Sequence, residues 1–150
     1  MTFLVSGNAC EALLEAVSQH LKADSTLDGL TTGIYGEVPR AARNTHPYVR
    51  LSSPDLDQDD FGGMGIGGGK VEFSLDTWSR NAHEVHTVLA RVLVLLERQP
   101  LTLERFTLAG GSLHCPHSLV FDEPVDPDLP DKGSLYHGHQ DWEADVEEAA

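Results

Sequence analysis

The chain has 150 residues, of which 40% are hydrophobic, and a formal net charge of −14. This length predicts one globular domain over residues 1–150, and no apolar run reaches the ~20 residues of a membrane-spanning helix. A surface this acidic is unsuited to DNA binding through phosphate contacts, which need Lys and Arg. The apolar start is also too short for a signal peptide, so we expect synthesis in the cytoplasm.

The first predicted element is a helix over residues 10–21. Apolar side chains recur there at the spacing of one helix face, and Ser6 or Asn8 is a candidate for its N-terminal cap. Short strands are predicted within residues 31–38 and at residues 48–52.

A long loop is predicted over residues 53–69. Six of its last eight residues are glycine, and glycine loses so much backbone entropy on ordering that a stable helix or central strand is disfavoured. Long loops in compact domains are usually functional or disordered. We expect a hairpin loop whose apolar side chains contact a partner, namely Phe61, Met64 and Ile66.

Residues 70–78 alternate between apolar and polar side chains, which predicts a strand with one packed face. Trp78 lies on the polar face, and because Trp is enriched at protein interfaces it is a candidate interface residue. A helix is predicted over residues 81–96. Asn81 followed by Glu84 has the spacing of a capping box at its start.

The rest of the chain predicts further strands and an acidic loop. A strand is expected at residues 102–109, with a turn at Gly110 and Gly111. Residues 112–114 and 119–121 would continue the sheet, with Pro116 marking an edge or a bend. Residues 122–133 contain three prolines and four aspartates, which is typical of a loop.

The last predicted strand covers residues 136–146 and alternates over its whole length. Asp141 and Glu143 lie on its polar face, so we expect them to point to solvent, a channel or a basic partner. The elements together predict an α+β fold: one mostly antiparallel sheet packed against two helices, with a long Gly-rich hairpin loop.

Histidine and cysteine residues offer an alternative, a small metal-binding domain or metal-dependent enzyme. Zinc accepts such ligands in tetrahedral sites, and the candidate set is His114, Cys115, His117, His137 and His139. Their spacing matches no familiar zinc finger, so surface histidines are the preferred interpretation. The glycine run matches Gly-x-Gly-x-x-Gly but precedes a strand instead of a helix, so no cofactor is expected. No catalytic motif is found, and we expect no enzyme activity.

The order of the elements carries a family resemblance. Residues 33–36 with Pro39, residues 47–51, the strand that ends in Trp78 with its following helix, and the closing strand together resemble the tail-completion proteins of long-tailed phages. These proteins are tail terminators or tail-to-head joining proteins, and gene transfer agents use similar components.

The resemblance implies a structural virion protein at the head-proximal end of the tail. Such proteins form a hexameric ring that caps the tail tube and stops its polymerisation. The implied partners are further copies of the chain, the tail tube protein and the head-side connector or stopper protein. DNA would pass through the ring without specific binding. No catalytic residue is implied.

Overall fold

The computed structural model describes residues 2–43, 45–52, 69–103, 106–123 and 135–148. The helices of these ranges are α1 (Thr2–Lys22), α2 (Ser25–Leu30) and α4 (Ala82–Leu96), with a short 3-10 helix η1 (Arg40–Ala42). The strands are β1 (Ile34–Tyr35), β2 (Tyr48–Ser52), β3 (Gly69–Ser79), β4 (Phe106–Glu123) and β5 (Leu135–Glu148).

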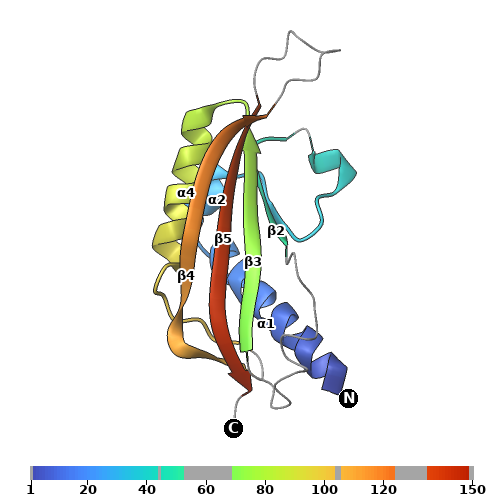
Figure 1. Cartoon of the computed structure of the whole chain (residues 1–150). Helices are drawn as coiled ribbons and strands as arrows, with labels where there is room; N and C mark the ends of the chain where they lie inside the picture. The colour runs from blue at the N-terminus through green and yellow to red at the C-terminus, as the bar shows by residue number, and fades with distance from the viewer. Residues whose placement is uncertain (1, 44, 53–68, 104–105, 124–134, 149–150) are drawn as a thin grey trace.

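The five strands form one sheet in the order β1-β2-β3-β5-β4. Every neighbouring pair is antiparallel except β1 and β2. The α1 helix contacts β1, β2 and β3, and α4 contacts β3, β5 and β4, so both helices cover the same face (Figure 1). The predicted α+β fold is therefore confirmed. None of the described helices is long and apolar enough to cross a membrane.

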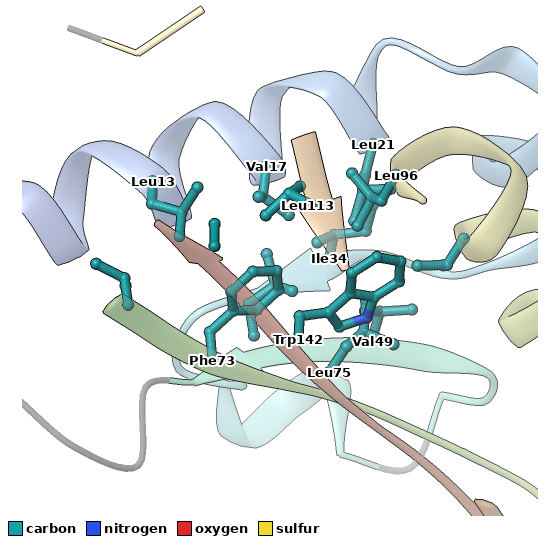
Figure 2. Packing of buried hydrophobic residues seen from close by; sticks show 14 of the residues in the cluster. Leu13, Val17, Leu21, Ile34, Val49, Phe73, Leu75, Leu96, Leu113 and Trp142 are labelled. Atoms are coloured by element: carbon teal, nitrogen blue, oxygen red, sulfur yellow. The ribbon is translucent and has the colours of Figure 1, made fainter. Parts of the chain in front are cut away.

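Alternation along β3 and β5 builds the core. Phe73 of β3 and Trp142 of β5 are directly opposite each other, and their rings stack at 6.2 Å. Figure 2 shows the α1 side chains Leu13, Val17 and Leu21 directed at these rings, and all five side chains are buried. Full burial of a large apolar side chain contributes about 1.5–3 kcal/mol, so this layer holds α1 on the sheet.

The start of α4 follows the predicted cap with one change. The Asn81 side chain accepts a hydrogen bond from the backbone N–H of His83 at 2.9 Å, as an N-cap does. Glu84 does not bond the Asn81 backbone directly. Instead, the Asn81 N–H donates to Ser79 Oγ, and the Ser79 hydroxyl donates to Glu84 at 2.6 Å. The Ser79 hydroxyl thus bridges the Glu84 carboxylate and the Asn81 N–H, in place of the direct hydrogen bond of a capping box.

Two local expectations are wrong. No turn occurs at Gly110 and Gly111, because β4 runs from Phe106 to Glu123 as one strand. Its register against β5 shifts between Ala109 and His114 and again before His117. Such irregularities absorb glycine and proline without ending a strand. The α1 helix begins at Thr2, so the candidate caps at positions 6 and 8 lie inside it.

The two predicted loops fall mostly outside the described residues. Residues 53–68 are not described, and this range includes Phe61, Met64 and Ile66. Residues 124–134 of the acidic loop are not described either, while positions 122 and 123 belong to β4. The first loop joins β2 and β3, which are antiparallel neighbours as a hairpin requires.

Candidate interface on the open face of the sheet

The face of the sheet opposite the helices is built by the alternate residues of β3 and β5. The antiparallel register places His137 opposite Trp78, His139 opposite Asp76 and Asp141 opposite Ser74. Side chains that are directly opposite on one face are close enough to interact. The register therefore turns separate polar positions into one continuous surface.

Five rings form a row across this face, one from each strand, and we call this set the aromatic row. Its members in sheet order are Tyr35, Tyr48, Trp78, His137 and Phe121. Successive ring centroids lie 6.5, 5.3, 4.5 and 4.6 Å apart, within the range of attractive aromatic contacts. The row ties all five strands together at one end of the sheet.

A charged cluster lies beside the aromatic row, centred on Asp76. The Asp76 side chain is only 4% exposed. Its Oδ1 accepts hydrogen bonds from His137 Nε2 and His139 Nδ1, both at 2.7 Å. Its Oδ2 lies 3.4 Å from the Arg50 guanidinium, which also stacks 5.0 Å from the Trp78 ring centroid. The buried carboxylate is thus fully partnered, as a buried charge must be.

The protonation of this cluster follows from its contacts. Burial alone raises the pKa of Asp76, but the hydrogen bonds from His137 and His139 outweigh it and lower the pKa below its usual value. Burial alone lowers the pKa of His139, but hydrogen bonds to Asp76 and Asp141 outweigh that effect and raise it. One ring nitrogen of His139 faces each carboxylate. This arrangement favours the doubly protonated ring.

The β4 strand forms one edge of the sheet. The residues that follow α4 cap one half of this edge by hydrogen bonds. The Glu97 side chain accepts a hydrogen bond from the Cys115 N–H at 2.9 Å, and the Arg98 N–H donates to the Leu113 carbonyl. Towards the other end, Leu119 is 57% exposed and the nearby aromatic side chain of the row is 44% exposed. An exposed apolar edge strand favours pairing with another chain.

The three described interface candidates all lie on this open face. Trp78 belongs to the aromatic row, and Asp141 hydrogen-bonds to His139 at 2.8 Å and to Ser74 at 3.3 Å. Glu143 forms an ion pair with Lys70 at 2.9 Å. Where β4 bulges, a hollow of about 420 Å³ opens beside Asp141 and Glu143. Their contact with a partner stays a prediction.

The predicted metal set does not come together as one group. His137 and His139 share a site with Asp76, which the sequence analysis did not select. His114 instead hydrogen-bonds to Glu97. Cys115 and His117 are not among the three ligand residues of that site. The Cys115 thiol donates to the His117 carbonyl, and His117 is opposite Asp141 in the sheet. The sequence analysis missed Asp76 because only the pairing of β3 with β5 brings this residue to the two histidines.

Comparison with known proteins identifies the family. Residues 15–143 match the family described as "Tail completion protein gp17". A chain in the structure titled "Virion of native gene transfer agent (GTA) particle" is similar, with a TM-score of 0.72, 23% identity and coverage of 93% of this chain and 97% of that one. The structure of bacteriophage SPP1 gp17 protein gives a TM-score of 0.56 and 19% identity, covering 91% and 89%. No curated protein matches the sequence significantly. Because the family match spans most of the chain, the protein belongs to the tail completion protein gp17 family and is a structural component of a phage-type virion tail.

Proposed function

We propose that the protein forms a six-membered ring that caps the tail tube and joins it to the head-side connector. The observation that carries this proposal is the likeness in fold, over 93% of the chain, to a chain of an assembled gene transfer agent particle. The family supports the same tail role. The role depends on contacts between proteins, and we propose no catalytic step.

A closed ring needs two different patches on each subunit that meet head to tail. We propose that the first patch is the uncapped half of the β4 edge, where Leu119 and Phe121 are exposed. The second patch would lie at the opposite end of the strand order, around the half-buried rings of Tyr35 and Tyr48 on β1 and β2. The two patches differ in composition, as head-to-tail contacts require.

The charge of the chain suits a ring through which DNA passes. Each subunit has a net charge of −14, so a ring of copies repels phosphates at short range and has few cations to retain them. Salt screens this repulsion within about 8 Å at physiological ionic strength. We expect no measurable binding of duplex DNA in an anisotropy titration at that salt concentration. Micromolar affinity would contradict a passive channel.

The decisive experiment is complementation in a particle-producing strain that lacks the gene. Without the protein, we expect tails of uncontrolled length that are not joined to heads, as seen by negative-stain electron microscopy. The double variant Leu119→Ser with Phe121→Ser removes the proposed first patch and should fail to restore joined particles. Val94→Ser is the matched control, because Val94 is 62% exposed and lies on α4, away from the proposed patch.

Circular dichroism of the purified variants separates loss of assembly from loss of folding. The proposal requires both variants to fold like the parent protein. If the double variant restores joined particles as well as Val94→Ser does, the β4 patch is not the ring contact. If particles form normally without the gene, the proposed capping and joining role is wrong.

A further inference from the structure

We propose that Asp76, His137 and His139 form a binding site for one divalent transition-metal ion, for which Zn²⁺ is the best fit. One ligand atom from each of the three side chains lies within 4.8 Å of the other two. This inference rests on the geometry of the three side chains and does not depend on the proposed tail role.

The ligand types suit zinc. Zinc binds imidazole nitrogen at about 2.0–2.1 Å and carboxylate oxygen at about 2.0–2.2 Å, in tetrahedral geometry, which places ligand atoms about 3.3 Å apart. The two imidazole nitrogens now lie 2.7 Å from the same Asp76 oxygen. Small side-chain rotations would therefore let His137 Nε2 and His139 Nδ1 coordinate the ion. Each imidazole would keep one proton on its other ring nitrogen and release any second proton to solvent.

The surroundings fix the ligands as a metal site requires. A metal-binding histidine usually donates its second ring N–H to a carboxylate, which sets the orientation of the ring. His139 already has this arrangement, because Nδ1 faces Asp76 and Nε2 lies 2.8 Å from Asp141. His137 is held by stacking on Trp78 at a centroid distance of 4.5 Å.

One carboxylate oxygen of Asp76, Oδ1, is available to bind the ion. Arg50 approaches Asp76 Oδ2, whereas both imidazoles approach Oδ1. The guanidinium therefore does not lie between the three ligand atoms. Three protein ligands leave the fourth tetrahedral position to water in the isolated chain, and the ion would reach them beside His139, whose side chain is 28% exposed.

Zinc binding to the metal-free full-length protein tests the site directly. After dialysis against a chelator, we would titrate Zn²⁺ in competition with a chromogenic chelator at about pH 8, above the reference pKa of free imidazole. We expect one ion per chain. His139→Gln and His137→Gln should lose this binding, and Asp141→Asn should weaken it about 10- to 100-fold, as loss of a supporting carboxylate does. Co²⁺ bound in the same site should give the visible absorption of a tetrahedral complex.

Matched controls exclude general histidine binding. His86→Gln changes an exposed histidine on α4, and His117→Gln changes an exposed histidine on β4; both should bind Zn²⁺ like the parent protein. The imidazole resonances of the unmodified protein give a test that needs no variant, since those of His137 and His139 should shift on adding one equivalent of Zn²⁺. Unshifted resonances, or equal affinity in the His139→Gln variant, would overturn the proposal.

Discussion

The absence of a side chain at Gly138 lets α4 pack close to the sheet, so the Gly138→Ala variant tests this packing. A methyl group at Gly138 would lie 2.6 Å from Val85 Cγ1 and 2.8 Å from Leu89 Cδ1. Both side chains are buried in the core and cannot withdraw into solvent. Overpacking of this kind typically costs about 1–3 kcal/mol, whereas alanine stabilises by about 0.4–1 kcal/mol because it restricts the unfolded chain. We expect a net loss of about 1–2 kcal/mol.

Urea unfolding followed by circular dichroism measures this difference. The control is Gly29→Ala in α2, where the added methyl group meets no atom within 4 Å. That variant should be more stable by up to about 1 kcal/mol, because alanine favours the helix. The same chemical change should therefore have opposite signs at the two positions. A Gly138→Ala protein as stable as the parent would refute the close contact. Additive losses in combination with Leu89→Ala, which removes the clashing Leu89 atoms but leaves Val85, would refute the contact with Leu89.

Three further predictions concern buried or paired polar groups. Gln140→Leu should lower the free energy of unfolding by about 1–3 kcal/mol in urea titrations, because Gln140 Oε1 accepts the hydrogen bond of the buried Trp142 Nε1–H at 3.1 Å; an unchanged value would contradict this. Hydrogen bonds from Arg91 lower the pKa of Asp24 from 3.8 to about 2, so their stabilisation is present above pH 3.8 and lost as the pH falls towards 2. The melting temperature of Asp24→Asn should thus vary less over this window, and an equal slope would refute it. Burial raises the pKa of the Cys115 thiol to about 11; with the other cysteine changed to Ser, alkylation of Cys115 at pH 8 should be about a hundredfold slower than that of a free thiol, and a comparable rate would disprove the shift.

Local sequence patterns were sufficient to predict β2, β3, β5 and α4. Strand alternation predicted which residues of β3 and β5 face the helices, and β2 was predicted with its observed bounds, Tyr48–Ser52. The apolar stripe and the Asn81 cap placed α4 to within one residue of its observed start. These signals depend on residues within a few positions of one another, so they are readable without the tertiary structure.

The prediction of a turn at Gly110 and Gly111 is wrong because of pairing with a distant strand. The neighbouring strand, β5, extends from Leu135 to Glu148 and pairs with both ends of β4. This long partner holds β4 as one strand, and irregular register accommodates the glycines. The sequence analysis also missed the short α2 helix, which Asp24 caps by accepting the Leu27 N–H. Six residues are too few to show a helical period.

Local sequence patterns could not predict the Asp76 cluster, for a different reason. The sequence assigned Asp76 to the polar face of its strand, and that assignment holds. Asp76 is buried by contacts with His137 and His139, which come from a strand 61 and 63 positions later in the chain. Only the register between β3 and β5 brings them together, and a slip of one residue would move the histidines to the other face.

The open face is therefore an ordered surface before any partner binds. Asp76 is buried without a covering helix because the rings and charges of that face bury one another. Association costs less when the contacting side chains are already fixed, since fewer rotamers remain to be immobilised. If this face meets a neighbour in the particle, Trp78→Ala should weaken assembly through the loss of a fixed ring and through the loosening of His137, which stacks on it. A metal ion at Asp76 would strengthen the same preorganisation, because it would hold β3 and β5 in one register.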